Sequence, residues 1–173
     1  MANTYVLLQF GSDPADTNLE DLEARAAFSI SEADRHPNLV CRVAREAEWC
    51  QQHPDIMGPN NSFLYFGPAN TPGYLVYGNG PEQPMLNSIR QRRDGSASRY
   101  FVAQNGREYK WKLGVERMEL VDSSRTAIAV WEVARPEDEF FARLTLRHSA
   151  LPIITEIMTT LTLNRMARDF NWG

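Results

Sequence analysis

The chain has 173 residues, and its 18 basic and 22 acidic side chains give a formal net charge of −4 at pH 7. A hydrophobic content of 43% is typical of a globular domain and excludes an intrinsically disordered chain, which could not bury enough apolar surface. The acidic balance also argues against a nucleic-acid partner, because affinity for phosphates needs a net positive surface. From the length of the chain we expect a single domain over residues 1–173.

The first half of the chain begins with a predicted strand at Thr4–Phe10, a β-rich run that ends at Gly11. Residues Asn18–Ala27 are predicted as a short helix, because the acidic residues near their start suit a first helical turn. Two aromatic runs, Ser62–Phe66 and Tyr74–Tyr77, are separated by a turn rich in proline and glycine and predict a β-hairpin.

The second half contains five further predicted strands, each bounded by turn residues. Asn105-Gly106 separates the first two and is a strong hairpin signal, because both residues tolerate a positive φ. The five strands are Tyr100–Ala103, Glu108–Leu113, Arg117–Val121, Thr126–Val133 and Phe140–Leu146. For the whole chain we expect eight to ten strands, most of them antiparallel.

A C-terminal helix is predicted over Ser149–Arg168, with Ser149 as the N-cap and Pro152 near the first turn. Its apolar residues cover more than one stripe, and the interruptions are mainly threonines, whose hydroxyls can bond to the helix backbone. A helix that is apolar around most of its circumference is buried on most sides. We therefore expect a mainly β (α+β) fold, with a strongly curled antiparallel sheet or a closed barrel around this helix; the alternative is a helix packed on one sheet face.

The location of the protein follows from what the sequence lacks. No segment approaches the ~20 apolar residues that cross a bilayer, and residues 1–10 lack the features of a secretory signal. Cys41 and Cys50 do not form a disulfide framework, so we expect free thiols and a cytoplasmic protein.

Several segments of the chain resemble one family, the domain of unknown function 6593. The similar segments, of which the second is the most specific, are Tyr65–Gly78, Asn105–Leu113, Thr126–Trp131 and Thr159–Arg165. The resemblance covers roughly residues 60–172 and implies a source among the mushroom-forming fungi, but it assigns no activity. Strands followed by an apolar C-terminal helix are also similar to the tubby/scramblase-like barrels, in which a closed sheet surrounds a helix.

The middle of the chain holds its only excess of basic residues. Residues 88–125 carry nine basic and five acidic side chains, whereas residues 1–87 carry four and eleven. If Glu108–Leu113 is a strand, Tyr109 and Trp111 face the core and Lys110 and Lys112 face outward. The candidate site for an anion or lipid is Arg90, Arg92, Arg93, Arg107, Lys110 and Lys112. Tubby-like domains bind phosphoinositides through such patches; the alternative is that these lysines only keep the strand soluble.

Aromatic residues form a second candidate site, an apolar pocket in the mouth of a barrel. Its residues are Phe63, Tyr65, Tyr74 and Tyr77, and the alternative is that these rings are core. Cys50, His53 and Asp55 lie close in sequence but read as a turn, and neither cysteine has the spacing of a zinc site. No catalytic, metal or cofactor motif is identified, so we expect neither a metal nor a cofactor.

Three hypotheses for function follow. The first is an intracellular protein that binds an amphipathic or lipid-like ligand, or an anionic membrane surface, through the basic face and the neighbouring aromatic residues. The second is a small enzyme that acts on an apolar metabolite in a pocket near Phe63–Tyr77. The third is a homodimeric interaction module that uses a sheet edge. The sequence leaves open whether the protein is an enzyme.

Overall fold

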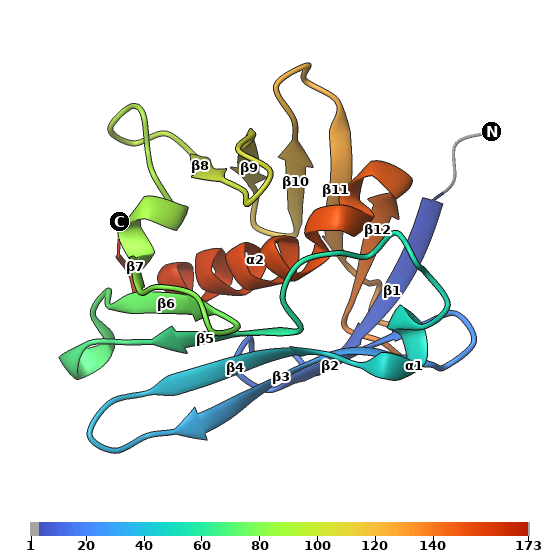
Figure 1. The fold of residues 1–173 in the computed structure, drawn as a ribbon, viewed down its shortest axis with the longest axis horizontal. Helices are drawn as coiled ribbons and strands as arrows, with labels where there is room; N and C mark the ends of the chain where they lie inside the picture. The colour runs from blue at the N-terminus through green and yellow to red at the C-terminus, as the bar shows by residue number, and fades with distance from the viewer. Residues whose placement is uncertain (1–3, 173) are drawn as a thin grey trace.

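The computed structural model of the protein describes residues 4–172, which form a twelve-stranded antiparallel sheet and a C-terminal helix (Figure 1). The strands are β1 (Thr4–Phe10), β2 (Thr17–Asp21), β3 (Ala26–Asp34), β4 (Val40–Arg45), β5 (Asn61–Tyr65), β6 (Tyr74–Tyr77), β7 (Gln83–Pro84), β8 (Ser98–Val102), β9 (Glu108–Leu113), β10 (Arg117–Val121), β11 (Ala127–Val133) and β12 (Ala142–Arg147). The helical segments are α1 (Ala47–Cys50), α2 (Ile154–Asp169) and the 3₁₀ turns η1 (Pro68–Asn70), η2 (Met85–Ser88) and η3 (His148–Ile153). The predicted mainly β class with a C-terminal helix is confirmed.

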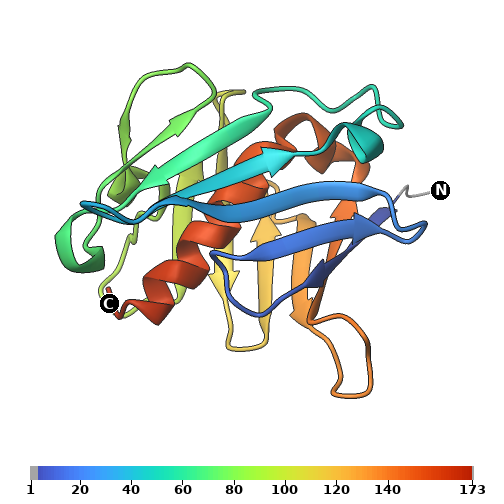
Figure 2. The same cartoon turned by 90° about the horizontal axis from the view of Figure 1, so that it is seen from below.

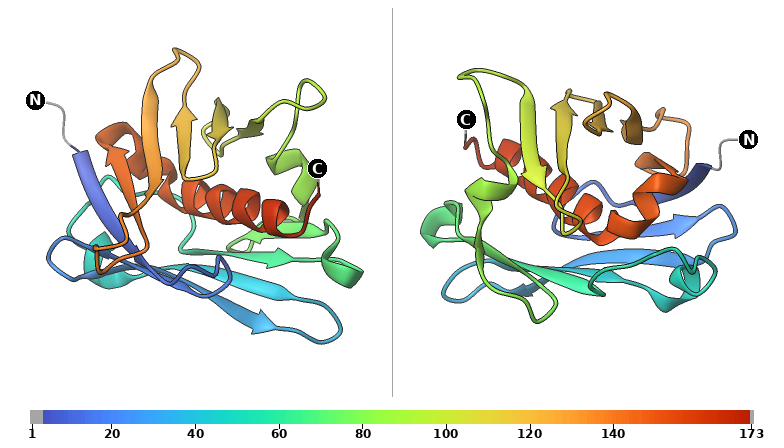
Figure 3. Two further views of the ribbon diagram at one scale, coloured as in Figure 1. Left: turned by 180° about the vertical axis from the view of Figure 1, so that it is seen from behind. Right: turned by 45° about the horizontal axis from the view of Figure 1, so that its top comes forward.

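Neighbouring strands in the sheet are neighbours in the chain, except where β1 pairs with β12. The spatial order is β7-β6-β5-β4-β3-β2-β1-β12-β11-β10-β9-β8. Across residues 4–172, β7 and β8 are therefore edge strands that do not pair with each other, and the predicted closed barrel is not confirmed. Figure 3 shows that β8–β12 lie on one side of α2 and β2–β6 on the other.

The chain passes between the two sheet edges through η2 and the residues that follow it. Arg90 forms an isolated bridge with Tyr100 of β8, and each residue donates its backbone N–H to the carbonyl of the other, at 3.1 and 2.8 Å. The backbone N–H of Met85 donates to the Gly73 carbonyl at 2.9 Å and holds η2 against the β6 side. We call this junction between η2 and β8, residues 85–98, the seam.

Most of the predicted strands are confirmed within one or two residues. The bounds predicted for β1, β6 and β9 match those observed, and the turn between β8 and β9 places Gly106 at a φ of +79°. Positive φ is what makes Asn-Gly suitable for a hairpin turn. The bounds predicted for β10 also match, whereas those of β8, predicted at Tyr100–Ala103, are shifted by one or two residues.

The predicted helix at Asn18–Ala27 is wrong, because this segment forms β2, a turn and the start of β3. The carboxylate of Asp21 organises the turn: its Oδ1 atom accepts the backbone N–H groups of Glu23 and Arg25, both at 2.9 Å. Acidic side chains bond to the backbone in this way in turns as well as in first helical turns. β3, β4 and β7 were not predicted, and the sheet has twelve strands instead of eight to ten.

The C-terminal helix is confirmed, although it begins later than predicted. Residues 148–153 form η3, which contains Pro152, and α2 begins after Ile153 without a side-chain cap. Ser149 is therefore not its N-cap. Twelve of the sixteen residues in α2 are buried, including polar residues on several faces, as expected for a helix that packs against strands on more than one side.

Buried polar side chains connect α2 to both parts of the sheet. The hydroxyl groups of Ser62 in β5 and Thr159 lie 2.7 Å apart, and on the other side the Trp111 indole N–H in β9 donates to the Thr160 hydroxyl at 2.9 Å. The Glu156 carboxylate accepts the backbone N–H of Gln104, after β8, at 2.9 Å. These bonds fix the position of the helix between the strands, because each buried polar group needs its partner.

We expect Thr160→Val to destabilise the fold by about 1–3 kcal/mol, because the indole N–H of Trp111 would be buried without an acceptor. Chemical denaturation measures this loss. Thr145→Val is the matched control, since Thr145 lies on a half-buried position of β12. Equal effects of the two substitutions would contradict a special role for the Trp111–Thr160 bond.

Burial raises the pKa of Glu156 to about 7, against the opposing effect of the Gln104 N–H. The folded state therefore holds the proton more tightly than the unfolded state, so this group lowers stability as the pH rises from about 4.5 to about 7. Glu156→Gln removes this titration. The difference in free energy of unfolding, variant minus wild type, should therefore rise by roughly 2–3 kcal/mol from pH 5 to pH 8. Chemical denaturation at both pH values tests this, with Glu139→Gln at an exposed position as the control. If Glu156→Gln and the wild type differ in stability by the same amount at pH 5 and pH 8, the prediction is wrong.

Candidate functional site

The predicted basic residues of β9 lie on the outer face of the sheet. Lys112 is exposed and Lys110 is half-buried, whereas Tyr109 and Trp111 face α2 and are buried. The predicted alternation along this strand is confirmed. Lys112 lies opposite Glu119 of β10 in the register of the sheet, and the carboxylate of Glu119 pairs with Arg117 at 3.3 Å.

Acidic and aromatic side chains occupy much of this basic surface. Arg92 and Arg90 both form ion pairs with Glu108, the second at 3.5 Å. The Arg92 guanidinium also lies 4.0 Å from the centre of the Tyr100 ring, and Lys110 lies 5.9 Å from it. The other two predicted residues, Arg93 and Arg107, are exposed in loops. The structure thus brings Arg90, Arg92 and Lys110 together, while their role in binding anions stays a prediction.

The four predicted pocket aromatics lie on two different faces of the sheet. Phe63 and Tyr65 stack at 6.1 Å, and Tyr65 and Tyr74 at 4.7 Å, on the outer face of β5 and β6. Tyr77 is buried on the inner face opposite Ser62, and burial raises its pKa. The four side chains therefore do not line one cavity, because the residues of a strand alternate between its faces.

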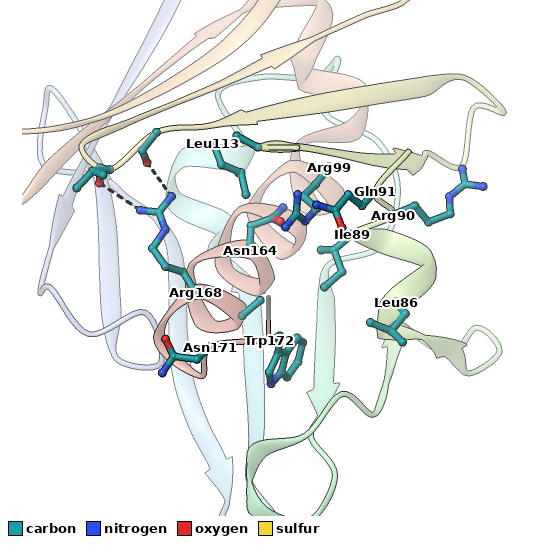
Figure 4. A pocket seen from close by; sticks show the side chains of 14 residues that line it. Leu86, Ile89, Arg90, Gln91, Arg99, Leu113, Asn164, Arg168, Asn171 and Trp172 are labelled. Carbon is teal, nitrogen blue, oxygen red and sulfur yellow. Dashed lines mark hydrogen bonds between the residues drawn. The ribbon is translucent and has the colours of Figure 1, made fainter. Parts of the chain in front are cut away.

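A pocket of about 770 Å³ lies at the seam, between η2, β8 and the C-terminal end of α2 (Figure 4). Its lining residues are Leu86, Ile89, Arg90, Gln91, Ala97, Arg99, Leu113, Gly114, Val115, Asn164, Ala167, Arg168, Asn171 and Trp172. The pocket lies where the sheet is open between β7 and β8, and Asn164, Ala167 and Arg168 from the C-terminal part of α2 line it. In Figure 2 strands from the first part of the chain cross in front of the first part of α2, and its C-terminal turns lie clear of them.

Two arginines in the pocket are held by backbone carbonyls. Arg168 donates to the Gly114 carbonyl at 2.7 Å and to the Val115 carbonyl at 3.2 Å, which ties the end of α2 to the turn between β9 and β10 (Figure 4). Arg99 donates to the Ser98 carbonyl at 3.1 Å and also to the Ser96 carbonyl. These bonds orient both guanidinium groups, and the carbonyl acceptors of Arg168 are neutral.

The pocket combines this charge with apolar walls. Ile89 and Leu113 contribute aliphatic side chains, and the half-buried Trp172 is held by a bond from its indole N–H to the Asn70 carbonyl at 2.8 Å. The side chain of Asn164 is 2% exposed and donates to the Thr160 carbonyl at 2.9 Å. The site can therefore hold both an anionic group and an apolar group.

Sequence reasoning placed only Arg90 of these residues in a site. Arg99 belongs to the basic segment, and Arg168 lies at the end of the predicted helix, so both carried a signal as basic residues. Arg99 and Arg168 come to line the same pocket because β7 and β8 are the edges of the sheet, and the sequence does not predict this strand pairing.

A separate polar cluster of Tyr5, Asp55 and His148 lies near the start of α2, and Cys50 is not part of it. The backbone N–H of His53 donates to the Cys50 carbonyl at 3.1 Å, which confirms the turn. Asp55 pairs instead with His148 at 2.7 Å, and the Tyr5 hydroxyl lies 3.0 Å from the other ring nitrogen of His148. Burial lowers the pKa of His53.

We expect both cysteines to resist alkylation in the folded protein at pH 8. Burial raises the pKa of Cys41 to about 12 and that of Cys50 to about 11, so the reactive thiolate is scarce at both positions. Mass spectrometry after iodoacetamide treatment measures this, with the denatured chain as the control. Rapid labelling of native Cys50 would contradict the prediction.

The comparisons with known proteins give a family and no activity. Residues 12–169 match a family of unknown function, DUF6593, so the similarity begins well before residue 60. No curated protein and no solved structure matches the chain. Within residues 4–172, no group of three or more His, Cys, Asp or Glu side chains is placed to hold a metal ion, and no helix is long and apolar enough to cross a membrane.

Proposed function

The chain belongs to the family of unknown function DUF6593, and we propose that its seam pocket binds a small anionic amphipathic ligand, such as an alkyl carboxylate or an alkyl phosphate. The pocket volume of about 770 Å³ suits a small molecule. The ligand class is that of the first hypothesis from the sequence, but the proposed binding site is the seam pocket instead of the basic outer face of the sheet.

One observation carries the proposal: three arginines, Arg90, Arg99 and Arg168, line the pocket, and of these Arg90 also pairs with Glu108 at 3.5 Å. Guanidinium groups bind carboxylates and phosphates through paired hydrogen bonds. Arg99 and Arg168 are already oriented by backbone carbonyls, so little side-chain freedom is lost when a ligand binds.

The apolar part of the ligand has its own place in the pocket. Ile89, Leu113 and Trp172 line the walls, and an alkyl chain gains about 0.8 kcal/mol for each methylene group that it buries. The titratable lining residues are arginines, which keep their protons at neutral pH, so the site favours binding over acid–base chemistry.

Several finer expectations stay predictions beside this proposal. They are the tubby-like closure of the sheet around α2, the fungal source, the cytoplasmic location, the single domain and the homodimer. The proposed binding does not depend on the source, the location, the domain count or the homodimer, whereas it does require the sheet to stay open at the seam.

Calorimetry with octyl phosphate, octanoate and octanol tests the proposal. We expect the two anions to bind more tightly than the alcohol, with an affinity that falls as salt screens the arginines. Arg168→Gln should weaken octyl phosphate binding roughly tenfold, because a charged hydrogen-bond donor is lost.

The control is Arg147→Gln, which removes the same charge from an exposed position of β12 outside the pocket. Equal binding of octanol and octyl phosphate would contradict the proposal. So would an Arg147→Gln variant as weak as Arg168→Gln.

A further inference from the structure

A hydrogen-bonded triad of Asp55, His148 and Tyr5 lies near the start of α2. The Asp55 Oδ2 atom is 2.7 Å from His148 Nε2, and the Tyr5 hydroxyl is 3.0 Å from His148 Nδ1. Three separate segments supply these side chains: the loop after α1, the first residue of η3, and β1. In Figure 1 α1 and β1 lie at the end of the molecule away from the C-terminus, and the seam pocket uses none of the three residues.

The partners of His148 determine which of its ring nitrogens carries the hydrogen. The ionised carboxylate of Asp55 can only accept a hydrogen bond, so the Nε2 atom of His148 is the donor. In the neutral imidazole Nδ1 is then an acceptor, and the Tyr5 hydroxyl donates to it. The phenolic proton of Tyr5 therefore points at a base that is itself oriented by a carboxylate. A nucleophile activated by a neighbouring base has this arrangement.

The ring of Tyr5 is held in place, while the triad remains open to solvent. Tyr5 is half-buried and packs against the main hydrophobic core. Its ring makes an edge contact with His53 at 4.9 Å between centroids, and His53 packs on Trp49 at the same distance. The side chains of His148 and Asp55 are 47% and 59% exposed. A small reactant can therefore approach the Tyr5 hydroxyl without a change in the core.

We propose that Tyr5 is a nucleophile that accepts an acyl group from an activated ester, with His148 as its general base. The Tyr5 oxygen forms a bond to the acyl carbon, and the phenolic proton passes to His148 Nδ1. The bond between the acyl carbon and the ester oxygen breaks, and its electron pair leaves with the alkoxide or phenolate. Asp55 is a positioning residue, because it holds the tautomer of His148 and stabilises the imidazolium that forms.

Charge favours an acyl group over a phosphoryl group as the electrophile. The triad itself contributes a carboxylate, and within residues 4–172 no arginine or lysine side chain pairs with any of its three members. Transfer of a phosphoryl group needs positive groups around the phosphate oxygens, whereas the carbonyl of an ester is neutral and is not repelled by Asp55. The structure therefore suits a neutral ester.

Labelling of the full chain with p-nitrophenyl acetate tests the proposal. Peptide mapping by mass spectrometry should find the acetyl group on Tyr5 well before it appears on Tyr65 or Tyr74, which are half-buried tyrosines outside the triad. His148→Gln should slow the acetylation of Tyr5 about a hundredfold, because a positioned general base is lost. The matched control is His36→Gln, which changes an exposed histidine outside the triad and should leave the rate unchanged.

The tautomer of His148 supplies a second readout, which tests the role of Asp55. Nitrogen-15 NMR of the neutral imidazole should place the hydrogen on Nε2 in the wild type. In Asp55→Asn the amide can donate to Nε2, so the form with the hydrogen on Nδ1 should increase and the acetylation of Tyr5 should slow. Asp55→Glu should restore both in part. A merely structural role for Asp55 would leave the tautomer unchanged in Asp55→Asn.

Three results would overturn the proposal. The first is acetylation of Tyr5 no faster than that of Tyr65 and Tyr74, a comparison that needs no variant and decides the matter even if His148→Gln does not fold. The second is equal labelling of Tyr5 in His148→Gln and the wild type. The third is release of p-nitrophenol by Tyr5→Phe as fast as by the wild type, which would make another group the nucleophile. None of these results bears on ligand binding at the seam.

Discussion

The burial of α2 is the constraint on which the rest of the structure depends. A helix with threonine, glutamate and asparagine among its buried residues can lie inside the protein only if each polar group finds a partner. Bonds to Ser62 on one side and Trp111 on the other provide two of these partners, and threonine hydroxyls bond back to the helix carbonyls. The strands are therefore tied to the helix as well as to each other, and the position of α2 sets where the two ends of the sheet can lie.

The seam is the consequence of this arrangement. The sheet ends at β7 and β8, and the end of α2 reaches the gap between them, so polar backbone and side-chain groups that strands would otherwise cover face a pocket. Arg168 links the helix end to the turn after β9, and Trp172 links the C-terminal residues to Asn70. These contacts make the pocket walls part of the same framework as the core, which is why we place binding here and not on the outer face of the sheet.

The sequence predicted this fold well where local signals are strong and poorly where distant pairing decides. Asn105-Gly106 predicts a hairpin whatever its surroundings; of the two strands beside it, β9 has the predicted bounds and β8 lies within two residues of them. The acidic residues after Asn18 fit a helix start and a turn equally well, and only the pairing of β2 with β1 and β3 decides for the turn. Because side chains alternate along a strand, Phe63 and Ser62 must point to opposite faces of β5. The aromatic residues of this segment are apolar enough to suit either face, so the sequence does not show which face is the core. The pocket could not be predicted, because Arg99 and Arg168 meet only after β7 and β8 are left as edges.

Photocrosslinking tests the central claim, that ligands bind at the seam, most directly. An alkyl phosphate with a diazirine in its chain would be bound, activated by light and located by peptide mapping. The account predicts labels on η2, on residues 113–115 and on the last turn of α2, and competition by unlabelled octyl phosphate. Labels gathered instead on Phe63, Tyr65 and Tyr74 of the outer aromatic stack would contradict it.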